Sequence, residues 1–134
     1  MIYFISGHRD VKKEEFEEYY VPKLREVLRD DSTAKFVVGD YWGVDEMAQE
    51  WLSHEGLAER VTVYHMFSSP RVCADPCFAT VGGFTGDEER DAAMTQVSDI
   101  DIAFVRPGKR MSGTAQNIVR RWEKLGVKKR VEDV

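Results

Sequence analysis

The stretch DIDIAFVRPGKRMSGTAQN, residues 99–117, joins a short apolar run to a segment with the apolar spacing of a helix. The apolar run predicts a buried strand over 99–105, and the spacing predicts a helix over 114–126. Ser112 or Thr114, in the turn between them, can cap this helix. The first backbone N–H groups of a helix have no partner within it, so the turn predicts a place where an anion can bind.

The same order of strand and helix extends along the chain. Short apolar or β-branched runs predict strands, and apolar residues at intervals of three and four predict helices. The expected strands cover residues 2–6, 34–39, 60–66, 99–105 and 127–133, and the expected helices cover residues 12–29 with an interruption near Pro22, 43–56, 87–97 and 114–126. This alternation predicts an α/β fold whose parallel sheet carries helices on both faces. At 134 residues the chain is expected to be one domain, residues 1–134.

Residues 67–86 show no periodicity and contain two prolines, both cysteines and the pair Gly82-Gly83. We expect this segment to be a loop that covers or lines a site, because long irregular segments are uncommon in compact domains. Cys73 and Cys77 show none of the paired spacings of a metal site. We therefore expect two reduced thiols, no metal and no cofactor.

Composition and charge exclude several classes of function. A net charge of -5 disfavours binding to duplex nucleic acid, which needs a basic surface. No apolar run approaches the roughly 20 residues that span a bilayer, and the N-terminal MIYFISGHRD lacks the pattern of a signal peptide. We expect a cytoplasmic protein that binds a small molecule and contacts neither a membrane nor a duplex.

Ligands of parallel sheets bind beyond the carboxyl ends of the strands. Four segments are expected there: SGHRD at 6–10, GDYWGVD at 39–45, GDEERD at 86–91 and RPGKRMSGT at 106–114. Glycine lets a backbone approach a phosphate closely, and arginine or histidine neutralises its charge. We expect phosphate contacts from Gly7, Arg9, Gly39, Gly43, Arg90, Gly113 and Thr114, further ligand contacts from His8, Asp40 and Ser112, and stacking of a base on Trp42 or Tyr41.

Four blocks of the chain resemble, in order, those of a known family. They are ISGHRD at 5–10, VVGDYWGVDEMAQEWL at 37–52, GDEERDAAM at 86–94 and SDIDIAFVRPGKRMSGTAQNI at 98–118. They look like the YspA-like (cpYpsA-related) branch of the SLOG superfamily, which includes the LOG phosphoribohydrolases and the DNA-processing protein A. The resemblance implies a Rossmann-like three-layer sandwich with a mainly parallel sheet of about five strands, and a nucleotide-type ligand.

The resemblance also implies roles for particular residues. Gly39, Gly43 and Asp45 match the glycine-rich second block of the family. Arg90 matches the arginine that acts on the ribosyl phosphate in the LOG enzymes, while Asp91 stands where the family motif has lysine. The two halves of the family's phosphate loop match Pro107, Gly108, Gly113 and Thr114, here separated by KRMS.

The LOG enzymes carry a glutamate shortly after the phosphate loop, and this chain has Asn117 there. In those enzymes the glutamate reaches the anomeric carbon. An asparagine can hydrogen-bond a ribose hydroxyl, but it cannot act as a nucleophile or take a proton. Asp40 or Asp10 can replace the missing carboxylate, and Arg90 is a third catalytic candidate.

Two functions of different classes remain open. In the first, the protein binds a nucleoside phosphate or an ADP-ribose-type ligand as a sensor or a sequestering protein. In the second, it is an N-glycosidase, a phosphoribohydrolase or a deoxyribosyltransferase-like enzyme acting on nucleoside phosphates. The missing glutamate favours binding. A pure interaction module is a third interpretation, and both a monomer and a homodimer, through the helix 12–29 or the helix around Trp122, remain open.

Overall fold

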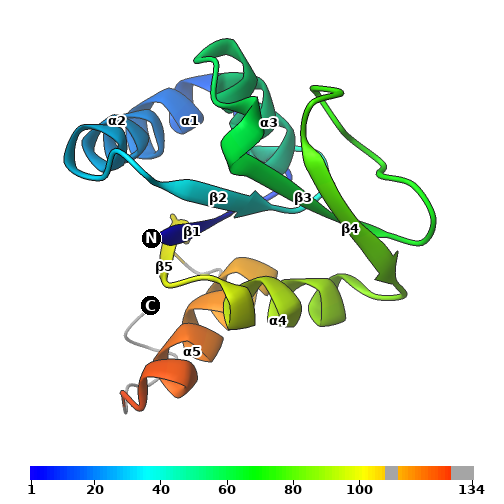
Figure 1. Cartoon of the computed structure of the whole chain (residues 1–134). Helices are drawn as coiled ribbons and strands as arrows, with labels where there is room; N and C mark the ends of the chain where they lie inside the picture. Colours follow the sequence, from blue (N-terminus) through cyan, green and yellow to red (C-terminus); the bar gives the residue numbers. More distant parts are fainter. Residues whose placement is uncertain (108–111, 128–134) are drawn as a thin grey trace.

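The computed structural model describes residues 1–107 and 112–127 (Figure 1). Its strands are β1 Ile2–Ser6, β2 Lys35–Val38, β3 Val61–Met66, β4 Ala79–Phe84 and β5 Ile100–Ala103. Its helices are α1 Lys13–Tyr19, α2 Val21–Asp30, α3 Val44–His54, the short 3-10 helix η1 Ala58–Arg60, α4 Asp87–Val97 and α5 Gly113–Leu125. The strands form one parallel sheet in the order β4-β3-β2-β1-β5.

Helices cover both faces of the sheet, as the alternation of elements predicts. Figure 1 shows α1, α2 and α3 on one face and α4 and α5 on the other. Successive side chains of a strand point to opposite faces. Ile5 therefore packs in the core on one side of the sheet, while Phe4 packs with Met94 of α4 on the other. The expected Rossmann-like three-layer sandwich is confirmed.

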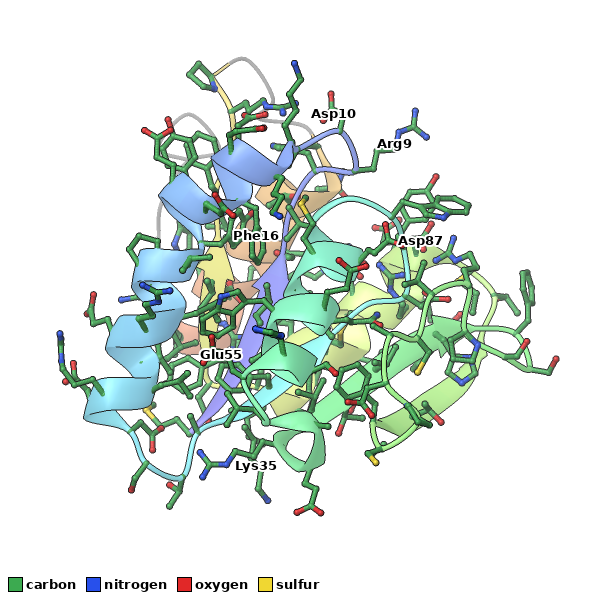
Figure 2. All side chains as sticks on the ribbon, turned by 90° about the horizontal axis from the view of Figure 1, so that it is seen from above. Arg9, Asp10, Phe16, Lys35, Glu55 and Asp87 are labelled. Carbon is green, nitrogen blue, oxygen red and sulfur yellow. The ribbon has the colours of Figure 1, made fainter. Side chains whose placement is uncertain are left out.

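The strand order places a switch point beside β1. From β1 the chain continues through β2 and β3 to the edge strand β4, and then returns to form β5 on the opposite side of β1. The connections after β1 and β5 therefore leave in different directions, and a crevice opens between them at the carboxyl ends of these strands. Figure 2 shows Arg9, Asp10 and Asp87 at this end of the sheet and Lys35 and Glu55 at the other.

Two sequence-based expectations about the elements need revision. Residues 67–86 are not entirely a loop, because β4 lies within them and pairs in parallel with β3. The strand prediction missed β4 because it is an edge strand with mostly exposed residues and two glycines, so the apolar pattern of a buried strand is absent. The fifth strand expected over 127–133 lies almost wholly outside the described residues.

The interruption expected near Pro22 is confirmed. The first helical segment is divided at Tyr20, and Pro22 occupies the first turn of α2, where the missing N–H of proline breaks no helical hydrogen bond. The buried Tyr20 side chain uses this position to donate its hydroxyl to the carbonyl of Ser6 at 2.7 Å. The same oxygen accepts the amide of Phe104 at 3.0 Å, so Tyr20 ties the ends of β1 and β5 together.

Two glycines with positive φ offer a matched test of the packing at the end of β1. A Cβ added at Gly43, φ 78°, would collide with the backbone of Arg9, whereas one at Gly56, φ 76°, would meet nothing within 4 Å. Gly43→Ala is expected to lower the free energy of unfolding by roughly 2–4 kcal/mol. Gly56→Ala should lower it by only about 1 kcal/mol, because it adds backbone strain alone. Urea unfolding measures both; equal losses would contradict this account.

Candidate functional site

A cavity of about 370 Å³ opens at the switch point, between the loops that follow β1 and β2 and the helices α4 and α5. The expected site residues that line it are Gly7, His8, Arg9, Tyr41, Trp42, Asp45, Arg90, Ser112, Gly113, Thr114 and Asn117, together with Asp10. Gly39, Asp40 and Gly43 do not line it. The cavity also includes Asp87 and Asp91, which we had not expected at a ligand.

The N-terminus of α5 forms one wall of the cavity. Ser112 has an extended backbone and its side chain accepts the amide of Ala115 at 3.1 Å, so it is the N-cap of this 13-residue helix. Helix geometry leaves the amides of Gly113 and Thr114 without an acceptor inside the helix. With the positive end of the helix dipole, these two amides make a local anion site.

The loop after β1 faces this helix across the cavity and is held to the end of β5 by Arg106. The Arg106 guanidinium binds Asp10 at 2.6 Å and Glu15 at 2.9 Å, and its amide contacts His8 Nε2 at 3.3 Å. Asp10 therefore sits at the mouth of the cavity in an ion pair and is mostly exposed. The role of Arg106 was not predicted, because its partners lie more than 90 residues away in the sequence.

Aromatic rings form the wall that follows β2. Trp42 is about half exposed although it lines the cavity, and its ring centroid lies 4.7 Å from that of Tyr41. The Tyr41 hydroxyl accepts a hydrogen bond from Arg9 at 3.2 Å, and the Arg71 guanidinium lies 4.6 Å from the centre of its ring. An exposed ring over a cavity is suited to stacking on a planar base.

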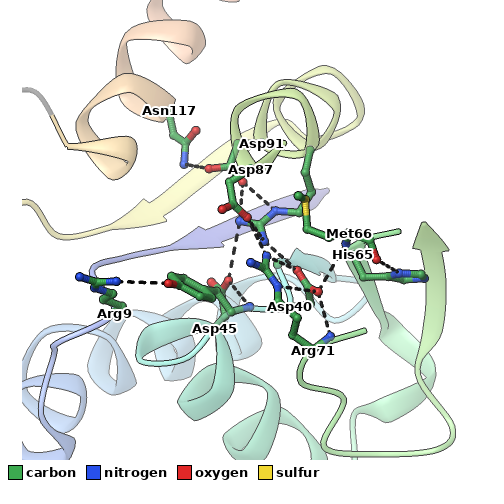
Figure 3. A network of polar contacts seen from close by, with 12 residues as sticks. Arg9, Asp40, Asp45, His65, Met66, Arg71, Asp87, Asp91 and Asn117 are labelled. Carbon is green, nitrogen blue, oxygen red and sulfur yellow. Dashed lines mark hydrogen bonds and ion pairs between the residues drawn. The ribbon is translucent and has the colours of Figure 1, made fainter. Parts of the chain in front are cut away.

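Arg90 of α4 is the centre of a network of carboxylates. Figure 3 shows these side chains, Asp40, Asp45, Asp87 and Asp91, gathered at one place. Arg90 is only 5% exposed, and its guanidinium contacts four acidic side chains: Asp40 at 2.8 Å, Asp91 at 2.8 Å, Asp87 at 3.1 Å and Asp45 at 3.9 Å. Arg90 is therefore a buried residue of the site and not a solvent-exposed charge of α4. Because its charge is already balanced, Arg90 is a poor primary ligand for a phosphate in this arrangement.

Asp40 is the member of this network that is buried away from the cavity. Its side chain is fully buried and is bound by Arg90, by two guanidinium nitrogens of Arg71 at 2.9 Å and 3.2 Å, and by the Arg71 backbone amide at 3.0 Å. Burial alone would raise the pKa of this carboxyl, but the hydrogen bonds from Arg71 and Arg90 lower it to about 2. Through Arg71, Asp40 holds the segment between β3 and β4 against the end of β2. The side chain of Gln49 holds the same segment by hydrogen bonds to the backbone of Val72 and Ala74.

Gly39 has a packing reason to be glycine. A Cβ at this position would lie 2.5 Å from an Asp45 oxygen and 2.8 Å from the guanidinium carbon of Arg90. Because glycine has no side chain, Arg90 and Asp45 can approach the end of β2 at this position. Gly39 therefore acts through the positions of Arg90 and Asp45, which line the cavity, and does not itself line it.

Asp45, in the first turn of α3, is the carboxyl group whose protonation is most altered. Its Oδ2 accepts the amide of Tyr41 at 3.1 Å, and the side chain is almost completely buried while lining the cavity. Burial raises the pKa of Asp45 to about 7; Arg90 opposes this rise, and the neighbouring charges of Asp91 and Asp40 add to it. A titratable group of this kind in a cavity is a candidate for chemistry.

Asp91 and Asn117 meet across the cavity from α4 and α5. The Asn117 amide donates to Asp91 Oδ2 at 3.0 Å, and Asn117 Oδ1 accepts from Arg120 at 2.7 Å. The other oxygen of Asp91 accepts from Arg90 Nε at 3.1 Å and from Arg90 Nη2 at 2.8 Å. Asn117, which stands where the LOG enzymes have glutamate, therefore has the carboxylate of Asp91 as its direct neighbour.

The loop cysteines lie away from this chemistry. Cys73 and Cys77 are both exposed and free. Within residues 1–107 and 112–127 no group of three or more His, Cys, Asp or Glu side chains is arranged to hold a metal ion. In the same part of the chain, no helix has the length and apolar character needed to cross a membrane.

Comparison of the chain with protein-family models, with curated proteins and with solved structures finds no match.

The raised pKa of Asp45 predicts how stability depends on pH. Between about pH 4 and pH 7 the folded protein keeps the Asp45 proton that the unfolded chain releases, so rising pH favours unfolding over this window. Asp45→Asn cannot ionise, and it should gain stability relative to the wild type by a few kcal/mol from pH 4 to pH 7. The Tm of both proteins, measured across this range, tests whether the variant gains stability relative to the wild type as pH rises. A difference in Tm that stays constant with pH would contradict the raised pKa of Asp45.

Proposed function

We propose that the protein binds a nucleotide-type ligand, a nucleoside phosphate or an ADP-ribose-type molecule, in the cavity at the carboxyl ends of β1 and β5. The observation that carries this proposal is the meeting of a capped helix N-terminus and an exposed tryptophan in one cavity. The first suits a phosphate and the second a base. A volume of about 370 Å³ lies within the range of small-molecule sites.

The acidic groups of the cavity narrow the chemistry of this ligand. Asp10, Asp45, Asp87 and Asp91 line it with Arg9 and the charge-balanced Arg90, so carboxylates are the majority of its charged side chains. Carboxylates bind hydroxyl donors and repel phosphates. A ligand that combines a phosphate with a hydroxyl-rich sugar therefore suits the cavity better than inorganic phosphate or a bare polyphosphate.

The resemblance to the SLOG superfamily supports the same class of ligand, and membership of that family is part of this proposal. Binding alone would suit a sensor or a sequestering protein. Cleavage of the N-glycosidic bond, the alternative function, requires a carboxylate at the sugar, and Asn117 cannot provide it.

Gly113 allows the anion site to be tested at a single backbone atom. Proline is tolerated at the first position of a helix, and the extended backbone of Ser112, φ -66° and ψ 163°, is the one that a following proline requires. Gly113→Pro removes one amide donor and should keep the helix. Affinity for ADP-ribose or for AMP, measured by titration calorimetry, should fall by roughly 10- to 100-fold, as expected for one charge-assisted hydrogen bond.

Gly113→Ala is the matched control, because it retains the amide and a Cβ at this position would meet nothing within 4 Å. Its affinity should stay within about twofold of the wild type. Equal affinities of the proline and alanine variants would show that the phosphate lies elsewhere. Failure of the wild type to retain any nucleoside phosphate or ADP-ribose would contradict the proposed function itself.

A further inference from the structure

The two oxygens of the Asp45 carboxyl group have different surroundings. Oδ2 accepts the amide of Tyr41 at 3.1 Å and lies 3.9 Å from Arg90 Nη2. Within residues 1–107 and 112–127, Oδ1 has no hydrogen-bond partner, and it is not enclosed by protein atoms. Only 9% of the side chain is exposed, and the side chain lines the cavity. The protein therefore holds Oδ2 and leaves Oδ1 facing the space that a ligand would occupy.

The groups packed around Asp45 give its negative charge little support. Its titratable or charged neighbours come from three segments: Arg90 and Asp91 from α4, Asp40 from the end of β2, and Tyr20 from the junction of α1 and α2. Arg90 is the one cation among them, and of the four carboxyl groups that contact it Asp45 is the most distant. A buried carboxyl group with so weak a cationic contact favours its neutral form.

A neutral Asp45 changes what the cavity offers to a ligand. A carboxylate can only accept hydrogen bonds, whereas a carboxylic acid also has one O–H donor. Because Oδ2 already accepts the Tyr41 amide, the proton belongs on Oδ1, the oxygen that faces the cavity. The neutral group also removes one negative charge from a wall that would otherwise repel a phosphate.

We propose that Asp45 binds the nucleotide-type ligand as a neutral carboxylic acid, an inference that rests on the proposed binding function. Its Oδ1–H group donates a hydrogen bond to an acceptor oxygen or ring nitrogen of the ligand. Where solution pH has removed this proton from the free protein, binding takes one proton back from solvent. Asp45 therefore makes the affinity of the site depend on pH.

The size of this dependence follows from the titration of Asp45. Burial raises the pKa of Asp45 to about 7, so below about pH 6 the free protein already carries the proton and the affinity is constant. Above about pH 7 only the protonated fraction binds, and each further pH unit lowers the affinity by up to about tenfold. Between about pH 6 and about pH 9 the expected loss is roughly 100-fold.

The test is calorimetric titration with ADP-ribose across this range, in pairs of buffers that differ in ionisation enthalpy. ADP-ribose is the suitable probe because its pyrophosphate stays ionised and its adenine stays neutral throughout. The wild type should lose roughly 100-fold in affinity and take up about one proton per ligand near pH 9. Asp45→Asn keeps an oxygen for the Tyr41 amide and carries an N–H donor at every pH. Its affinity should match that of the wild type near pH 6, stay constant to about pH 9 and involve no proton uptake.

Glu46→Gln is the matched control, because it changes the adjacent carboxyl group of α3, which does not line the cavity. It should keep the pH profile of the wild type. A wild-type affinity that does not change with pH would overturn the neutral acid, and this result needs no variant to fold. Proton uptake that persists in Asp45→Asn would also overturn it, since another group, such as His8, Asp10, Asp87 or Asp91, would then supply the titration. Both results leave the binding proposal standing, whereas absence of binding at every pH would overturn both.

Discussion

The buried guanidinium of Arg90 is the contact on which the candidate site depends. It joins the end of β2, through Asp40, to the start of α3, through Asp45, and to α4 itself, through Asp87 and Asp91. Removal of one member of a buried ion pair commonly costs about 3–5 kcal/mol, because the remaining charge has no partner. Arg90 therefore fixes the relative positions of three segments and sets the different environments of Asp45 and Asp91 at the same time.

The sheet order explains why these side chains surround a cavity and not a packed interior. The strand order reverses beside β1, so the loop after β1 and the N-terminus of α5 diverge. Arg106 and Tyr20 connect the ends of β1 and β5, from which these two segments leave the sheet. One wall of the resulting space offers backbone amides and the opposite walls offer carboxylates and aromatic rings. This polarity is what connects the geometry to a ligand with a phosphate, a sugar and a base.

Most of the fold could be predicted from the sequence, because buried parallel strands such as IYFIS at 2–6 and VTVYHM at 61–66 are continuous apolar runs. β4 escaped prediction because an exposed edge strand lacks that pattern. Eleven of the expected ligand residues line the cavity, since glycine and charge at the ends of strands follow from topology. The partners of Asp40 and the contact between Asp91 and Asn117 could not be predicted. They depend on contacts between residues 26 to 50 positions apart, which no local pattern encodes.

The most direct measurement is a crystal structure of the protein with ADP-ribose or AMP bound. This account predicts a phosphate oxygen within hydrogen-bonding distance of the Gly113 and Thr114 amides, a base against Trp42, and sugar hydroxyls near the carboxylates that line the cavity. A ligand seated away from α5, or one whose phosphate binds Arg90 in place of its carboxylates, would contradict it.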